Sequence, residues 1–227
     1  MGVLLIPGLL CDRFCWEPVL ADLAAEVADL STQDDLTWMA RDLLARHPGP
    51  LSVAGHSMGA RVALEMARLA PARIQRLALL DTGIHPLRPG EREKREEITR
   101  FAHEAGMAAL CDRWLPPMVW QGNQTNTALM DGLRAMVLRK DAALHERQIK
   151  ALVNRPDAST TLAQITCPVL LMVGQHDQWS PVAQHQDMEA LLPHARLEII
   201  ENAGHFAPVE QPAAVAALLV PFLRGAV

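Results

Sequence analysis

The stretch LSVAGHSMGARVALEMA, residues 51–67, decides the fold of this chain. It begins with a short apolar run typical of a buried strand, and it continues from Ala60 with good helix formers. Between them lies Gly55-His56-Ser57-Met58-Gly59. A serine in this context sits on a strained strand-to-helix turn, where bulky neighbours would collide with nearby backbone. The stretch predicts Ser57 as a nucleophile, and the plainer alternative is a Gly-Ser turn that caps an ordinary helix.

Similar units recur on both sides of this stretch. Apolar runs between turn residues predict strands at Val3–Ile6, Leu51–Ala54, Ile74–Leu80, Val169–Val173 and Leu197–Ile200, with a weaker candidate around Val27–Leu30. Helical spacing of apolar residues predicts helices at Glu17–Ala28, Thr37–Arg46, Ser57–Leu69, Pro181–Leu192 and Pro212–Leu223. Alternating strands and helices predict an α/β protein with a mostly parallel, doubly wound sheet.

One long segment interrupts this alternation. Residues 84–163 contain no strand-like run, and they read as several helices with polar joints. The charged run Glu91–Arg100 has acidic and basic residues four apart, as on a solvated helix face. We therefore expect a core domain formed by residues 1–83 and 164–227, and a helical cap formed by residues 84–163.

Two further residues stand where a base and an acid are needed. A serine hydroxyl requires a base, and His205 follows the last predicted strand. Asp177 follows the strand Val169–Val173, and Asp81 follows the strand Ile74–Leu80. Loops at the carboxyl ends of parallel strands meet at one rim, so these residues are expected to lie together. The order Ser57, Asp177, His205 favours Asp177 as the acid, with Asp81 as its rival.

The chain resembles the α/β-hydrolase superfamily over nearly its whole length. The resemblance rests on Ile6-Pro7-Gly8-Leu9, Gly55-His56-Ser57-Met58-Gly59, Gly174-Gln175-His176-Asp177 and Gly204-His205-Phe206-Ala207-Pro208. It is greatest to small capped esterases, lactonases and carbon–carbon hydrolases, and Ser57-Met58-Gly59-Ala60-Arg61 is also similar to the menaquinone-pathway lyase branch.

The resemblance implies an oxyanion hole formed by the backbone N–H groups of Leu9 and Met58. Many members of the family carry His-Gly where this chain has Pro7-Gly8, so the loop lacks that side-chain support while its backbone donor is retained. The family's usual first strands have no counterpart before Val3, so a short N-terminus is expected. No cofactor or metal is implied.

Composition narrows the classes of function and partner. The 227 residues carry a formal net charge of −5, which provides no basic surface for nucleic acid. No apolar run reaches the length of about 20 residues that a membrane span requires, and no signal peptide is evident, so a soluble, cytoplasmic protein is expected. The four cysteines include no Cys-x-x-Cys pair, and Cys11 and Cys15 are expected to be reduced and packed near a helix start.

The remaining side chains suggest a pocket and a reaction. Trp114, Met118 and Trp120 form an apolar cluster that either lines an acyl pocket or is the core of the cap. Arg61 either meets an anionic substrate or, as we prefer, forms a surface salt bridge. We expect hydrolysis of a small ester, thioester or lactone with an apolar acyl part through an acyl-enzyme on Ser57. A lyase or carbon–carbon hydrolase and a non-catalytic ligand receptor stay open, as does the oligomeric state.

Overall fold

Six parallel strands form a single sheet in the computed structural model, which describes residues 2–192 and 194–226. The strands, in spatial order, are β2 (Glu26–Val27), β1 (Gly2–Ile6), β3 (Leu51–His56), β4 (Ile74–Leu80), β5 (Val169–Gly174) and β6 (Ala195–Ile200). The strand order reverses next to β1, as in a doubly wound sheet. The predicted fold class is confirmed.

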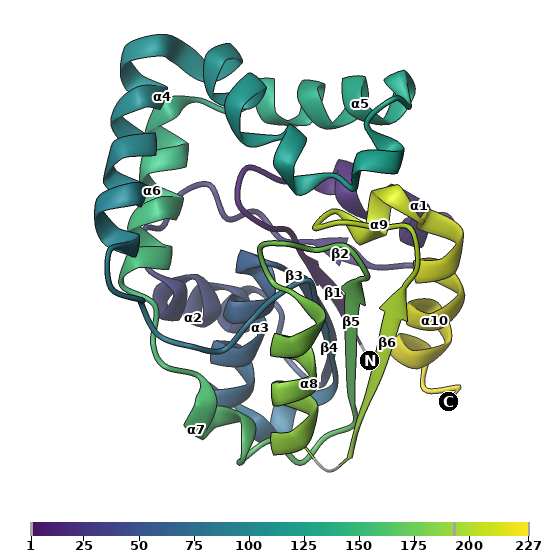
Figure 1. The fold of residues 1–227 in the computed structure, drawn as a ribbon. Helices are drawn as coiled ribbons and strands as arrows, with labels where there is room; N and C mark the ends of the chain where they lie inside the picture. The colour runs from purple at the N-terminus through teal and green to yellow at the C-terminus, as the bar shows by residue number, and fades with distance from the viewer. Residues whose placement is uncertain (1, 193, 227) are drawn as a thin grey trace.

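Helices cover both faces of this sheet (Figure 1). They are α2 (Leu36–Arg46), α3 (Met58–Leu69), α8 (Val182–Leu191) and α10 (Pro212–Arg224). The short helices α1 (Glu17–Leu20) and α9 (Ala207–Glu210) pack on α10. Helix α3 packs on β1, β3 and β4, α8 packs on β5 and β6, and α10 lies on β3 and β4 beside α1. Every residue of β3 and of β5 is buried, which explains why these strands read as continuous apolar runs rather than alternating ones.

The predicted helix Glu17–Ala28 is wrong beyond its first turn. Helix α1 ends at Leu20, and the chain turns into the short strand β2. Strand β2 pairs with β1, and the N–H of Ala28 donates to the carbonyl oxygen of Leu5 at 2.8 Å. Of the apolar residues that suggested a helix, Val19 and Leu23 are buried, and Leu20 and Val27 are half-buried. Pairing with β1 is a long-range interaction, and it outweighs the local helical spacing.

Within the described residues, all of the regular secondary structure between β4 and β5 is helical. It contains α4 (Glu91–Trp114), α5 (Thr127–Leu138), α6 (Ala142–Val153) and α7 (Ser159–Leu162). Helix α4 is kinked at Gly106, whose φ of 84° is outside the helical region. Helices α4, α5 and α6 rise above the carboxyl ends of the strands, whereas α7 returns to lie beside α3 (Figure 1). No helix among the described residues is both long and apolar enough to cross a membrane.

Candidate active site

The turn between β3 and α3 presents Ser57 in a strained conformation. Ser57 has φ 53° and ψ −114°, a region that residues with a side chain seldom occupy. Its N–H donates to the carbonyl oxygen of Leu80 at 2.8 Å, which fixes the turn. A β-carbon at Gly55 would collide with the backbone of α3, and one at Gly59 would collide with the carbonyl oxygen of Ile6. The two glycines therefore allow the close strand–helix packing that the sequence predicted.

Ser57, His205 and Asp177 are brought together by three different loops. Nε2 of His205 lies 2.8 Å from Oγ of Ser57, and Nδ1 of His205 lies 2.8 Å from Oδ2 of Asp177. The other carboxylate oxygen of Asp177 accepts hydrogen bonds from the N–H groups of Trp179, at 2.8 Å, and Ser180, at 2.9 Å. This chain of contacts is the geometry in which a serine hydroxyl can transfer its proton to an imidazole.

The negative charge of Asp177 and the positive charge of protonated His205 stabilise each other. Burial opposes ionisation of Asp177, but His205 and the two backbone donors hold the pKa of its carboxyl below the usual value. Burial likewise opposes a charged His205, but the adjacent Asp177 raises the pKa of the imidazole above its usual value. An ionised Asp177 therefore stabilises the imidazolium that forms when His205 accepts a proton.

The rival acid, Asp81, lies near the hydrogen-bonded series of Ser57, His205 and Asp177, but its carboxyl does not contact the imidazole of His205. Oδ1 of Asp81 accepts from the N–H of Gly174 at 2.9 Å, and Oδ2 lies 3.7 Å from Nε2 of His56. Asp81 is fully buried, and burial together with repulsion from Asp177 raises the pKa of its carboxyl well above the usual value. The geometry favours Asp177 over Asp81 as the partner of His205.

Leu9 and Met58, whose backbone N–H groups are the predicted oxyanion donors, line the same cavity as Ser57. Within the described residues, the N–H groups of Leu9 and Met58 make no hydrogen bond. The loop that carries Leu9 is held from the cap, because Oε1 of Gln148 in α6 accepts from the N–H of Leu10 at 2.8 Å. Gln148 was not predicted, since nothing in its local sequence connects it to a loop 138 residues earlier. It supplies the side-chain support that the Pro7-Gly8 sequence does not.

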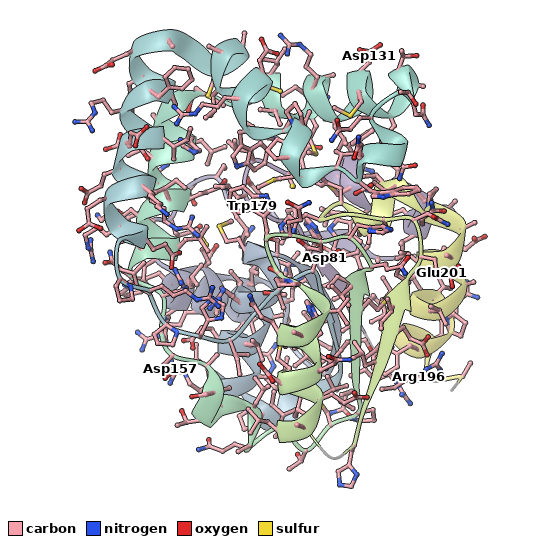
Figure 2. The ribbon with its side chains drawn as sticks, in the orientation of Figure 1. Asp81, Asp131, Asp157, Trp179, Arg196 and Glu201 are labelled. Atoms are coloured by element: carbon pink, nitrogen blue, oxygen red, sulfur yellow. The ribbon has the colours of Figure 1, made fainter. Side chains whose placement is uncertain are left out.

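A cavity of about 550 Å³ opens at Ser57, between the sheet and the cap. Its lining includes Ser57, His205, Leu9 and Met58 from the core, and Trp114 and Met118 from the cap. Trp179 also lines it and is half exposed, at the carboxyl edge of the sheet beneath the cap (Figure 2). Of the three aromatic and methionine residues proposed for either the pocket or the cap core, Trp120 is not part of the lining and instead stacks on His176, with ring centroids 5.0 Å apart.

Basic side chains predominate among the charged residues that line the cavity. Its charged lining consists of one carboxylate, Glu91, and six basic side chains, Arg61, Arg88, Lys94, Arg95, Arg113 and Arg155. Glu91 is bound by Arg95 and Arg155. The preferred surface salt bridge of Arg61 is not formed among the described residues, where its guanidinium donates to the carbonyl oxygen of His85 at 3.2 Å. Burial and the neighbouring arginines lower the pKa of Arg61 to about 9.

No three His, Cys, Asp or Glu side chains within residues 2–192 and 194–226 are grouped in a way that could hold a metal ion. His56 lines the cavity together with Ser57.

Comparisons with known proteins agree with this geometry. The sequence profile of the alpha/beta hydrolase family matches residues 3–218. A pimeloyl-[acyl-carrier protein] methyl ester esterase of Nitrosomonas europaea is 30% identical over 180 residues, which cover 76% of this chain and 71% of the relative. A putative 2-succinyl-6-hydroxy-2,4-cyclohexadiene-1-carboxylate synthase of Bacillus subtilis is 28% identical over 188 residues, covering 76% of this chain and 65% of that protein.

A solved structure has nearly the same fold. A thermophilic esterase of Thermogutta terrifontis, solved with malate bound, is 25% identical, with a TM-score of 0.91 over 99% of this chain and 90% of the esterase. The family profile spans most of the chain, and the structural likeness includes the segment above the sheet. This protein belongs to the alpha/beta hydrolase family.

Proposed function

We propose that this hydrolase cleaves small carboxylic esters, thioesters or lactones through an acyl-enzyme on Ser57. One observation carries the proposal, namely the continuous contact from Ser57 through His205 to Asp177, in which Ser57 and His205 line the cavity. The esterases among its relatives support the same reaction class.

In the proposed reaction, Nε2 of His205 accepts the proton of Ser57 as Oγ attacks the substrate carbonyl. The negative charge that develops on the carbonyl oxygen is bound by the N–H groups of Leu9 and Met58. Loss of one such donor costs roughly a hundred- to a thousand-fold in rate. His205 then protonates the leaving group, and in the second half it activates the water that releases the acid.

The proposed substrate has an apolar part and an anionic group. Trp114, Met118 and Phe206 supply apolar and aromatic surface close to His205, which suits an acyl or alkyl chain. The excess of basic side chains in the cavity lining suits a carboxylate, because a buried cation is stabilised by an opposite charge. A cavity of about 550 Å³ accepts a small molecule but limits its length.

A second candidate function is a lyase or carbon–carbon hydrolase, in which Ser57 or His205 acts as a base without an acyl-enzyme. Arg61 favours it, because its guanidinium enters the cavity without a carboxylate partner among the described residues and can hold an anionic substrate group. The similarity to the putative synthase of Bacillus subtilis points the same way. A third candidate, a ligand receptor, predicts binding without turnover.

The deciding experiment is intact-mass analysis after exposure to a fluorophosphonate. We expect one adduct on the wild-type protein and none on Ser57→Ala, whereas Ser31→Ala, a serine outside the cavity lining, gives the wild-type adduct. Release of p-nitrophenol from p-nitrophenyl acetate should depend on Ser57 in the same way. A folded wild-type protein without an adduct would contradict the acyl-enzyme proposal. Ester turnover by the wild type excludes the receptor.

A further inference from the structure

Glu210 carries a buried carboxylate that the proposed reaction does not use. It ends the short helix α9, five residues after His205, and its side chain is 7% exposed. Its partners in the described residues are N–H groups rather than cations. A buried carboxylate is costly unless hydrogen bonds replace its contacts with water, so the groups that supply them indicate what Glu210 does.

One carboxylate oxygen of Glu210 binds the backbone on both sides of His205. Oε1 accepts from the N–H of Gly204 at 2.9 Å and from the N–H of Phe206 at 3.2 Å. The N–H of His205 itself donates to the carbonyl oxygen of Met118, in the cap, at 2.8 Å. Three consecutive N–H groups are thus held, two of them by Glu210 and one by the cap.

The other carboxylate oxygen of Glu210 binds the same part of the cap. Oε2 accepts from the N–H of Trp120 at 2.9 Å and from Nδ2 of Asn123 at 3.0 Å. Both donors lie within residues 118–123, the cap segment that also binds the N–H of His205. An ionised carboxylate accepts about four hydrogen bonds, so Glu210 is fully used in joining this cap segment to the loop of His205.

The cap segment also packs directly on the backbone of the His205 loop. A β-carbon at Gly204 would lie 2.7 Å from both the carbonyl oxygen of Met118 and the backbone nitrogen of Trp120. A β-carbon at Gly174, at the end of β5, would collide with the carbonyl oxygen of Gly204. The loop is therefore in close contact with backbone of both the cap and the sheet.

The imidazole of His205 needs this support because it has two partners at once. Its ring nitrogens lie 2.8 Å from Oγ of Ser57 and 2.8 Å from Oδ2 of Asp177, and its carbonyl oxygen accepts from Nε2 of His56 at 2.7 Å. A backbone shift of about 1 Å could lengthen either ring contact beyond hydrogen-bond range. A misplacement of that size costs roughly a hundred-fold in rate.

We propose that Glu210 is a positioning residue for His205, whose carboxylate holds the His205 loop and the cap segment in one arrangement and so makes proton transfer from Ser57 depend on the cap. The inference rests on the proposed function, because it assigns a role in that reaction. Glu210 is not part of the cavity lining, so it acts through His205 and not on the substrate.

Glutamine at this position keeps the size of the side chain and removes its second acceptor. The amide NH₂ group only donates, so two of the four N–H groups that Glu210 binds lose their acceptor in Glu210→Gln. We expect the second-order rate constant of fluorophosphonate labelling to fall by about ten- to a hundred-fold. We expect a similar fall in kcat for p-nitrophenyl acetate, with KM changed less than threefold. Glu201→Gln, at an exposed glutamate four residues before His205, is the matched control and should react as the wild type does.

The extent of labelling distinguishes a misplaced His205 from a loss of folded protein. A partly unfolded variant is labelled incompletely, and its folded fraction reacts with the wild-type rate constant. A folded variant in which His205 is misplaced is labelled completely but slowly. Intact-mass analysis of the adduct against time measures both quantities, and circular dichroism before labelling shows whether the variant is folded.

Asn123→Ala is a milder variant that tests the same connection. Nδ2 of Asn123 donates to Glu210 and also to the carbonyl oxygen of Asn202, at 2.9 Å, which lies three residues before His205. Its loss should lower the labelling rate constant by about two- to tenfold, as for one or two hydrogen bonds, while labelling still reaches completion.

Two outcomes would overturn the proposal. One is a folded Glu210→Gln protein with the wild-type labelling rate constant, whether its labelling is complete or incomplete. The other, which decides the matter if Glu210→Gln does not fold, is a wild-type rate constant in Asn123→Ala. A wild-type protein that gives no adduct contradicts the proposed function itself, and the role of Glu210 with it. That result is read before any variant is made, so the two failures are distinguishable.

Discussion

At the scale of single residues, two buried carboxylates at the same edge of the sheet have opposite surroundings. Asp177 faces a histidine and accepts two backbone N–H groups, which stabilise its ionised form. Asp81 is fully buried and is repelled by Asp177, and these two effects stabilise its neutral form against the single backbone N–H that it accepts. Divergent pKa values within a pair of neighbouring acids indicate a division of roles.

Substitution of each acid by its amide distinguishes these roles. We expect Asp177→Asn to lower kcat for p-nitrophenyl acetate by about 10⁴-fold, since the amide does not stabilise the imidazolium of His205. Asp81→Asn keeps an acceptor for the N–H of Gly174 and should lower kcat by less than about tenfold. Steady-state kinetics of the two folded variants checks this. Comparable losses in both would contradict the assignment of Asp177.

The charge of His205 makes reactivity depend on pH. Its pKa is raised in the folded protein, so the neutral form that accepts the Ser57 proton appears only as the pH rises through that value. The rate of fluorophosphonate labelling should increase with pH, with a midpoint above the usual histidine value of about 6.5. Measurement of the second-order rate between pH 5 and 9 tests this. In Asp177→Asn the midpoint should fall, because the attracting anion is gone.

At the scale of secondary-structure elements, a cap helix supports the loop after β1. Leu10 in this loop has φ 58°, a strained value for a residue with a side chain, and its N–H is bound by Gln148 of α6. Gln148 is itself buried and also donates to the carbonyl oxygen of Leu30. The position of the Leu9 N–H group therefore depends on the contact between α6 and the core.

Removal of this support should affect the chemical step more than substrate binding. In Gln148→Ala, the N–H of Leu10 loses its acceptor, and the proposed oxyanion donor at Leu9 is less well positioned. We expect kcat for p-nitrophenyl acetate to fall by about ten- to a hundred-fold, a part of the effect of losing one oxyanion donor, with KM changed less than threefold. Gln121→Ala, a cap glutamine outside the cavity lining, is the control. A loss confined to KM would contradict this role.

At the scale of the whole molecule, a buried ion pair ties the start of the cap to its end. The guanidinium of Arg155 follows α6, and it donates two hydrogen bonds to Glu91 at the start of α4, at 2.7 and 2.8 Å. It also donates to the carbonyl oxygens of His85, Pro86 and Leu152. Its side chain is 2% exposed. One side chain thus fixes both connections between the cap and the sheet.

Loss of this side chain should destabilise the protein. Arg155→Met leaves Glu91 without its closest cation and should lower the free energy of unfolding by about 3 kcal/mol, as for other broken buried pairs. Arg46→Met, which removes an exposed pair with Asp42, should cost less than about 1 kcal/mol. Urea denaturation at pH 7 compares the two. Equal effects would show that the Arg155 contacts add little.

The ion pair between Arg155 and Glu91 also makes the stability of the protein depend on pH. Burial alone would raise the pKa of Glu91, but Arg155 and Arg95 lower it to about 2. The folded-state pKa is below the unfolded value of about 4.5, so this stabilisation is complete above that value and is lost as the pH falls toward 2. The wild-type protein should lose more stability than Arg155→Met between pH 5 and pH 3. Parallel pH profiles would contradict the linkage.

Local sequence determined the parts of this protein that depend on neighbouring residues. The run from Leu51 to Gly59 specified a strand, a strained turn and a helix, because the glycines and the apolar pattern act within a few residues. Ser57, Asp177 and His205 could be predicted to lie together because each follows a strand, and parallel strands bring their carboxyl ends to one rim. The fold class followed from the same alternation.

Tertiary structure alone decided the features that join distant segments. The strand β2 replaced a predicted helix because it pairs with β1. Gln148 meets Leu10, and Arg155 meets Glu91, through contacts between segments far apart in the chain. Trp120 stacks on His176 instead of lining the cavity. Local sequence encodes the spacing of apolar residues and the positions of turns. A hydrogen bond between distant segments forms only after packing has removed the competing water.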